Sequence, residues 1–474
     1  MQFLASTPIA IALIGALMFV GLRRGLWIFF AMMPLGAMAA FNLPAVGNAS
    51  FGIRELAVIC LLGLVLAQPR GLDNVMGTLR MGQPGGVALI LLIYCVLSAL
   101  WVPSVFSGMT QVFTISRDAN SHGIRSIPLG PSSGNLTQLF ALSLSLAAFL
   151  ALATNSRTDP DPHRIEKAMA VATAINLGLG LVDLASGMVG AGKIMDMVIR
   201  TANYSILSEA KMMGFKRMIG GFPEASSFGS FSMGLFGFWM HRYLIDPKSR
   251  RALVMFLIAL FCVVRSTSSA AYVAIVVYIF IYAVYSAATR MRSVLSKQIV
   301  ITSILGILLL WHAMILIFAA YQLVEPVTAF LNETLFDKAG SSSGVERMSW
   351  NTQAMKNLTD TWLIGAGLGS ARASNWLLSS LGSVGLPGTA LFVAFLISVF
   401  RMRVVPQGSP TDMTVSALKW GCVATIVTEL LIASTPNIGV FFFAMTGLAT
   451  GLARSTQLVE APKQTPPFAR RRAA

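Results

Sequence analysis

The chain has 474 residues, of which 55% are hydrophobic and only 11% are charged, and its mean hydropathy is +0.72. A soluble globular domain carries about 25% charged residues, so this composition excludes one and requires lipid to cover the surface. The net charge of +16 does not indicate nucleic-acid binding, because the Lys and Arg residues fall in short clusters between apolar runs, as membrane orientation signals do. The four Cys and four His residues show no metal-ligand spacing, and we expect neither a metal site nor a cofactor.

The apolar runs predict helices that cross a membrane, because a spanning helix needs about 20 mostly apolar residues. The sequence lacks the alternating strands that build membrane barrels. We therefore expect an all-α, polytopic transmembrane bundle of about 12–13 spanning helices. Arg23 and Arg24 separate the first two runs, which predicts a helical hairpin. The expected helices lie at 6–22, 25–41, 54–67, 85–102, 135–154, 168–190, 223–240, 252–268, 271–288, 299–321, 384–400, 413–433 and 437–453.

Loop charges predict the orientation of the bundle. When the helices alternate, clusters of basic residues in the short loops fall on one side, which the positive-inside rule makes the cytoplasm. These residues are Arg23, Arg24, Arg70, Arg80, Arg157, Arg164, Lys167, Arg242, Lys248, Arg250, Arg251, Arg290, Arg292, Lys297, Arg401, Arg403 and Arg470 to Arg472. We expect one transmembrane domain over 1–454 and a disordered basic cytoplasmic tail over 455–474. Long outer loops are expected at about 103–134, 191–222 and 322–383, the last before the final three helices.

The second long loop ends in a run that combines cations with a break in the backbone pattern. Lys216 and Arg217 precede Gly220-Gly221-Phe222-Pro223, and Glu224 follows. One interpretation is a solvated turn that leads into a helix capped near Glu224. The other is irregular backbone at membrane depth, which is tolerated only where it is buried in protein or lines a cavity. In that case Arg217 is an anion ligand, because a guanidinium can bind two phosphate oxygens at once.

The third long loop carries a second arginine, Arg347, at the beginning of a short amphipathic helix expected over about 349–358 on the outer surface. There the unpaired N–H groups of a helix start could also meet an anion. Gly365, Gly367 and Gly369 follow. They lack the preceding strand of a dinucleotide-binding motif, so we expect a flexible turn.

Ionisable residues also interrupt several apolar helices near their outer ends. Such charges are costly in a membrane and usually face a cavity or a partner. Each one could be a snorkelling or paired structural charge, but their common depth favours a single polar chamber that opens outward. The residues are Arg54, Glu55, Asp183, Arg265 and Glu429.

Together these segments resemble the O-antigen ligase and polymerase family, integral membrane enzymes that join glycans carried on undecaprenyl pyrophosphate. The resemblance covers most of residues 50–450 and depends on the order and spacing of the motifs. Ligases of the family tend to have a His before the Asn of the last motif. Here Arg372-Ala373-Ser374 precede Asn375, which favours a polymerase over a ligase. The matching segments are Arg217–Gly229, Arg265–Ala270, the helix after Arg347, Trp362–Gly369 and Asn375–Gly388.

The resemblance implies a metal-independent glycosyltransferase that joins O-antigen or exopolysaccharide repeat units at the outer face of the bacterial inner membrane. Its substrate would be an undecaprenyl-pyrophosphate-linked oligosaccharide, and a chain-length regulator and a flippase are expected partners. Arg217 and Arg347 would stabilise the departing pyrophosphate, and Glu224 would deprotonate the acceptor hydroxyl. Weaker candidates for the base are Glu346, Asp183 and Glu429. Substrate-binding roles fall to Arg265, Arg200, Lys216 and Glu429.

Three alternatives stay open. A ligase would use the same anion site but transfer the glycan once to a different acceptor. A transporter of lipid-linked oligosaccharides or other solutes would often show internal repeats and broken helices near the midplane, which this sequence does not display. A non-catalytic subunit of an assembly machine would tolerate substitution of both arginines.

Overall fold

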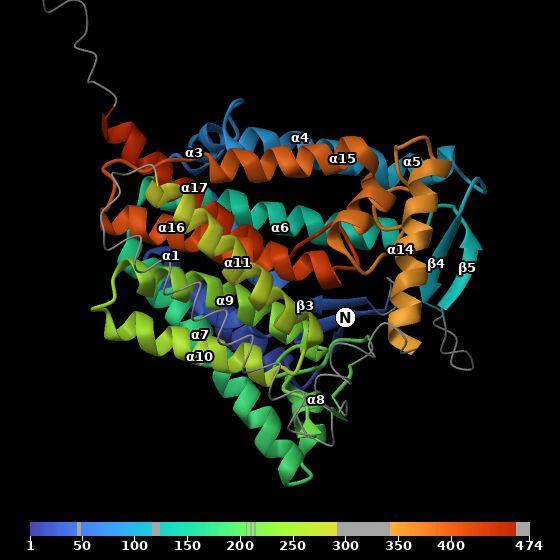
Figure 1. The fold of residues 1–474 in the computed structure, drawn as a ribbon, viewed down its shortest axis with the longest axis horizontal. Coiled ribbons are helices and arrows are strands. Elements are labelled where there is room, and N and C mark those ends of the chain that lie inside the picture. The colour runs from blue at the N-terminus through green and yellow to red at the C-terminus, as the bar shows by residue number, and fades with distance from the viewer. Residues whose placement is uncertain are drawn as a thin grey trace, which may run out of the picture.

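The computed structural model describes residues 1–44, 49–115, 124–204, 206–208, 211–212, 215–291 and 342–460. Within these residues the chain is mostly helical, with three small antiparallel sheets (Figure 1). The all-α prediction is therefore confirmed as a fold class, while the short strands were not expected. The predicted helix at 299–321 and the first part of the loop at 322–383 lie outside the described residues.

Nearly every other expected helix is present, and most ends lie within six residues of the prediction; α15 begins eight residues earlier than expected and α17 ends seven residues later. The helices are α1 (Thr7–Met32), α2 (Ile53–Leu66), α3 (Gly71–Thr78), α4 (Pro84–Leu100), α5 (Val102–Val105), α6 (Ser133–Thr158), α7 (Pro162–Met188), α8 (Gly192–Val198), α9 (Ala225–Ile245), α10 (Arg250–Arg265), α11 (Ser269–Met291), α14 (Ser342–Asp360), α15 (Trp376–Phe400), α16 (Pro410–Ile432) and α17 (Val440–Glu460). The strands are β1 (Gln2–Phe3), β2 (Ala39–Leu43), β3 (Ala49–Gly52), β4 (Gln111–Ile115), β5 (Ile124–Pro128), β6 (Lys211–Met212) and β7 (Phe215–Lys216).

Among the described residues, seven helices are long and apolar enough to cross a membrane, or eight if α2 and α3 form one span bent by 112°. The chain is therefore a multi-pass membrane protein, and the larger number of spans stays a prediction. α9, α10 and α17 are not among the seven. In α9 the reason is its position, since this Ser- and Gly-rich helix is buried along most of its length by other helices. Such a helix needs no apolar surface toward lipid.

The first helix, counted above as one span by its length, folds back at Gly21, so the predicted hairpin has two short arms and not two spanning helices. Gly21 breaks the helical backbone at φ +69°, and Ser6 and Thr7 donate hydrogen bonds to the carbonyls of Ala39 and Ala40 at 2.6 and 2.5 Å. A straight helix of 26 residues is about 39 Å long, and the few residues after Met32 could not return to its start. The prediction was wrong about the second arm, which ends at Met32 because the chain then enters strand β2.

Close helix contacts build the centre of the bundle, where α6 packs on α17 and α9 packs on α16. Gly447 and Gly451 make the first of these contacts possible. A Cβ atom at either position would lie 2.5 Å or less from a carbonyl oxygen of α6. Small residues spaced by four let two membrane helices approach closely.

The glycine turn between α14 and α15 is tightly packed, which corrects the expectation of a flexible turn. Gly365, Gly367 and Gly369 all have φ between +86° and +95°, a region that other residues rarely adopt. A Cβ atom at Gly369 would lie 2.4 Å from the carbonyl oxygen of Gly134, and Asn135 donates to the carbonyl of Leu368 at 2.8 Å. We call residues 361–375 the glycine joint, because this segment links α14 to α15 and fastens both to α6.

The two ends of the bundle differ in composition (Figure 1). At the end that we call the basic end, Arg23 and Arg164 pair with Asp159 at 3.5 and 2.8 Å, and Arg242 pairs with Glu166 at 2.7 Å. The opposite end, the strand end, carries the sheet β1–β3, the hairpin β4–β5 and helix α14. Arg23, Arg164 and Arg242, from three of the predicted basic loops, thus lie at one end, whereas Arg292, Lys297 and the tail arginines lie outside the described residues. α17 continues to Glu460, into the predicted tail, and 461–474 lie outside the described residues.

Candidate functional site

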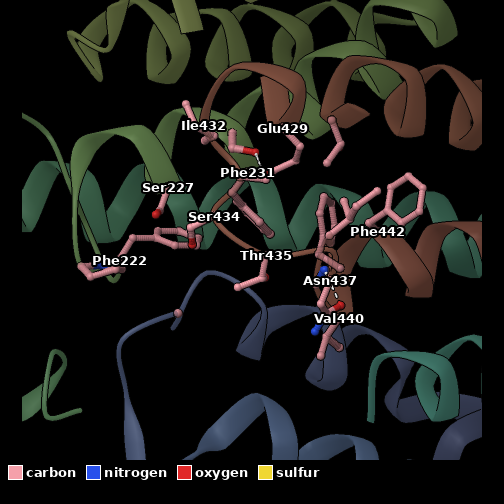
Figure 2. A pocket seen from close by; sticks show the side chains of 18 of the residues that line it. Phe222, Ser227, Phe231, Glu429, Ile432, Ser434, Thr435, Asn437, Val440 and Phe442 are labelled. Carbon is pink, nitrogen blue, oxygen red and sulfur yellow. Dashed lines mark hydrogen bonds between the residues drawn. The ribbon is translucent and has the colours of Figure 1, made fainter. Parts of the chain in front are cut away.

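A polar cavity of about 310 Å³ opens at the strand end. Its walls come from the beginning of α9, the end of α16 and the loop 433–439 (Figure 2). This volume is at the lower end of the range, roughly 300–1,000 Å³, that is usual for ligand pockets. The lining combines charges, hydroxyls and aromatic rings: Arg54, Glu224, Glu429, Tyr204, Ser227, Ser230, Ser434, Thr435, Asn437, Phe222, Phe231 and Phe441.

The backbone break at Gly220-Gly221-Phe222-Pro223 forms one side of this cavity. Residues 218–222 are all buried, and Phe222 and Pro223 line the cavity. Gly221 is needed because a Cβ atom there would lie 2.5 Å from the carbonyl oxygen of Pro34. The interpretation as a solvated turn is therefore wrong, and the break is irregular backbone buried in protein.

Asp183 fixes the segment that leads into the break. Its buried carboxylate accepts hydrogen bonds from Arg200 at 2.8 Å and Lys216 at 2.9 Å, and from the backbone N–H groups of Ile219 and Gly220 at 3.1 and 3.3 Å. Arg200 also pairs with Asp196 at 2.6 Å. Charges buried this deeply are stable only when partners satisfy them. These hydrogen bonds leave Asp183 poorly suited to act as a base. Arg200 and Lys216 are committed to this network, and neither lines the cavity.

Arg217, the next residue, lies in a different environment. Its Nη2 donates to the carbonyl of Thr267 at 3.0 Å, and its buried Nε has no hydrogen-bond partner among the described residues. Burial lowers the pKa of the Arg217 guanidinium, the Glu224 carboxylate and the Tyr272 hydroxyl partly restore it, and the Arg347 cation lowers it further. An arginine stays protonated in proteins despite such shifts. The fold has therefore brought Glu224 and Arg347 each within electrostatic range of Arg217.

The turn between α10 and α11 holds Arg217 through the hydrogen bond to the carbonyl of Thr267. Its central residue, Thr267, has φ +48°, which is an outlier for a β-branched side chain. The hydroxyl of Ser266 donates to the carbonyl of Val263 at 2.7 Å and helps to hold the turn. Strained backbone of this kind gathers at functional sites. Arg265 ends α10 here, and the charges of Arg265 and Arg217 both act on Tyr272.

Arg347 reaches this region from α14. The helix begins at Ser342, earlier than expected, so Arg347 lies in its second turn and not at its beginning. The expectation that unpaired helix N–H groups stand beside this arginine is therefore wrong. Gln353 attaches α14 to strand β4 by donating to the carbonyl of Gln111 at 2.7 Å. Glu346 is exposed to solvent.

Two carboxylates face the cavity from different helices. Glu224 is the N-cap residue of α9 and accepts a hydrogen bond from the hydroxyl of Ser226. Glu429, near the end of α16, accepts one from Ser230 at 2.5 Å. Of the five candidate charges in apolar helices, Arg54 and Glu429 line the cavity, whereas Asp183 supports its wall. Glu55 and Arg265 do not line it, so the cavity contains only two of the five charges that the sequence assigned to a single polar chamber.

Sequence reasoning missed two parts of the lining, namely Tyr204 and the loop from Ser434 to Asn437. Tyr204 donates to the carbonyl of Gly36 at 3.2 Å, and Arg54 donates to the same carbonyl at 3.0 Å. Asn375 and Trp376 hold the loop by donating to the carbonyls of Leu430 and Pro436 at 2.5 and 2.9 Å. The polar run Ser434-Thr435-Pro436-Asn437 between two apolar helices was the available signal.

The comparisons with known proteins identify no family for this chain. No protein-family model matches it, and the search of curated proteins found no match. The functional assignment therefore depends on the residues and the geometry of the cavity.

Proposed function

We propose that this protein is a polysaccharide polymerase that joins lipid-pyrophosphate-linked saccharide units at the strand end of the bundle. The observation that carries the proposal is the meeting of Arg217, Arg347 and Glu224, which come from distant parts of the chain. Within the described residues, neither arginine forms a salt bridge with a carboxylate. Neither arginine lines the cavity itself, but Glu224 does and acts electrostatically on Arg217. A ligand that extends from the cavity to the two cations would supply the missing negative charge.

A pyrophosphate leaving group provides that charge. As the bond from the anomeric carbon to the pyrophosphate oxygen breaks, negative charge grows on the oxygens. Arginines already in place stabilise this charge most strongly where water is excluded. Arg217 is half-buried and held by Thr267, and Arg265 adds a third positive charge on the same side.

The acceptor sugar would occupy the cavity. Hydroxyl side chains and Asn437 offer hydrogen bonds to sugar hydroxyls, and Phe222 and Phe231 offer apolar faces. The acceptor hydroxyl oxygen attacks the anomeric carbon while the electron pair of the broken bond leaves with the pyrophosphate. The hydroxyl proton passes to the Glu224 carboxylate, which lines the cavity and acts electrostatically on Arg217. Glu429 binds the sugar or replaces Glu224 in this role.

The orientation follows from the charges. The basic end would face the cytoplasm by the positive-inside rule, which puts the strand end and the cavity at the outer face of a bacterial inner membrane. The C-terminus would then be cytoplasmic. A flippase would supply the lipid-linked units to this face, and a chain-length regulator would bind nearby. The absence of His before Asn375 favours the polymerase over a ligase.

Complementation of a deletion strain tests the proposal. The variants are Arg217→Ala, Arg347→Ala and the control Lys356→Ala, an exposed cation on the same helix as Arg347. We expect single repeat units in place of long polymer in the deletion strain. Wild type and the control should restore polymer, and neither arginine variant should do so when present in the membrane at wild-type levels.

Other outcomes would point elsewhere. Polymer of normal length that stays on the lipid carrier would indicate a ligase. Repeat units that accumulate on the cytoplasmic leaflet would indicate a flippase. Full complementation by both arginine variants would show that the protein is a non-catalytic subunit.

A further inference from the structure

A second cavity, of about 850 Å³, lies at the basic end, far from the first. It is formed between α11, α16 and the linker that follows α15. One part of its lining is cationic and another is apolar. The residues that matter here are Arg401, Arg403, Lys419, Asp412, Tyr285 and Trp420.

The cations of this cavity outnumber its carboxylates. Arg401, Arg403 and Lys419 face a single carboxylate, Asp412, which already accepts a hydrogen bond from the backbone N–H of Gly408 at 2.9 Å. Within the described residues, neither Arg401 nor Arg403 forms a salt bridge. The cavity therefore has an excess of positive charge.

Lys419 is the best placed of the three cations. Its ammonium donates to the carbonyl of Phe400 at 3.1 Å and to that of Met402. These bonds hold the ammonium in a half-buried position against the linker. An ammonium has three donors, so one remains for a ligand. Attraction of a cation to the C-terminal end of a helix dipole does not explain this position, because Lys419 lies in the middle of α16.

The other part of the lining is suited to a lipid. The rings of Tyr285 and Trp420 meet at 5.1 Å, and Ile281, Val415 and Val423 continue the apolar surface. Tyr and Trp gather where the bilayer interior meets the head groups. A soluble anion needs only the cations, whereas a molecule with an anionic head and an apolar body contacts both surfaces. Basic pockets between membrane helices on the cytoplasmic side bind acidic lipid head groups.

We infer that this cavity binds an acidic phospholipid, with its phosphate against Lys419, Arg401 and Arg403 and its glycerol and upper chains along Tyr285 and Trp420. The site is independent of the proposed polymerase reaction, because it lies at the opposite end of the bundle and shares no residue with the first cavity.

Native mass spectrometry of the full chain in detergent tests this inference. The probes are phosphatidylglycerol, phosphatidylcholine and inorganic phosphate. We expect phosphatidylglycerol adducts on the wild type, few phosphatidylcholine adducts, and no competition from inorganic phosphate. Each basic residue near a membrane surface strengthens binding about fivefold, so the double variant Arg401→Gln/Arg403→Gln should bind phosphatidylglycerol about thirtyfold more weakly.

The matched control is Arg250→Gln/Arg251→Gln, which removes two exposed arginines from the same end of the bundle. It should bind phosphatidylglycerol like the wild type. Equal losses in both double variants would show general charge attraction and overturn the inference. So would equal binding of the two lipids. Displacement by inorganic phosphate would show an anion site without lipid recognition. Because Arg401 and Arg403 are exposed, this variant tests binding without disturbing the core.

Discussion

Two neighbouring groups of arginines in this protein have opposite surroundings. Arg200 is fully buried and paired with Asp183 and Asp196, although its Nη2 has no hydrogen-bond partner within the described residues. Arg217, on the same loop, has no carboxylate partner there. The paired group holds backbone in place, whereas Arg217 is within electrostatic range of Glu224, a residue of the cavity wall. The difference teaches that pairing, and not burial or residue type, separates structural charges from candidate functional ones here. The same rule separates the paired arginines of the basic end from the cations around Lys419.

The largest expected effect comes from breaking the paired group. Asp183→Ala would leave Arg200 and Lys216 without their shared anion and remove the acceptor of two backbone N–H groups. Removing one partner of a buried ion pair costs about 3–5 kcal/mol. Thermal unfolding in detergent should show this loss, and polymer synthesis should fail with it. Unfolding at the wild-type temperature would show that the network does not hold the loop.

Arg217→Ala should have the opposite effect, with a large loss of polymer synthesis and little loss of stability. Removing a preorganised donor to a developing charge lowers the rate of an enzyme by about 10²–10³-fold, and we expect that loss in polymer synthesis by membrane vesicles. The free energy of unfolding should change by about 1 kcal/mol or less, because only one hydrogen bond to Thr267 is lost. Arg217→Lys keeps the charge but not the fork of donors, and should rescue little. A stability loss equal to that of Asp183→Ala would contradict the comparison.

Lys216 tests the boundary between the two groups. The sequence predicts a substrate-binding role for Lys216, whereas the structure attaches it to Asp183 at 2.9 Å with a side chain 19% exposed. We expect Lys216→Met to lower the free energy of unfolding by about 2–3 kcal/mol, because its hydrogen bonds to the carboxylate and to the carbonyl of Asp183 are both lost, and to leave polymer length nearly normal. Short polymer from a protein of unchanged stability would restore the substrate-binding role.

The smallest effect is expected at an exposed pair. Arg23 pairs with Asp159 at 3.5 Å, and its side chain is 82% exposed. Exposed ion pairs contribute about 0–1 kcal/mol, so Arg23→Ala should leave both thermal unfolding and polymer length within error of the wild type. A clear loss of stability would show that pairing at the basic end contributes more than its exposure allows.

The helices of this fold could be predicted because they depend on local composition. Apolar runs of sufficient length lie at nearly all the expected positions, and the charge cluster at Arg23 and Arg24 predicted the turn near Gly21. Strands β2 and β4 could not be predicted in the same way. They are short, and each pairs with the strand that follows it in the chain. β2 also pairs with β1, which depends on the first helix returning the chain to its start.

The residue types of the candidate site could be predicted from the sequence. Which of the charges are structural and which are candidates for function could not. Arg200, Lys216 and Arg217 look equivalent in the sequence, and only the position of Asp183 on another helix separates them. Glycines 365, 367 and 369 were misjudged for a related reason. A glycine-rich turn is flexible unless neighbouring backbone fills the space beside it, and the neighbouring backbone here comes from α4, α6 and α15.

The glycine joint has a consequence for the thermodynamics of ligand binding. Because the backbone of the joint packs closely against Gly134 and Gly385, the end of α14 that it joins is held in a fixed position. Ordering a mobile backbone costs about 1–2 kcal/mol for every residue fixed. A helix α14 that is already fixed avoids most of that cost when an anion binds to Arg347. Binding then restricts little more than the arginine side chain itself. A larger side chain at Gly369 would weaken the ligand complex without touching the ligand.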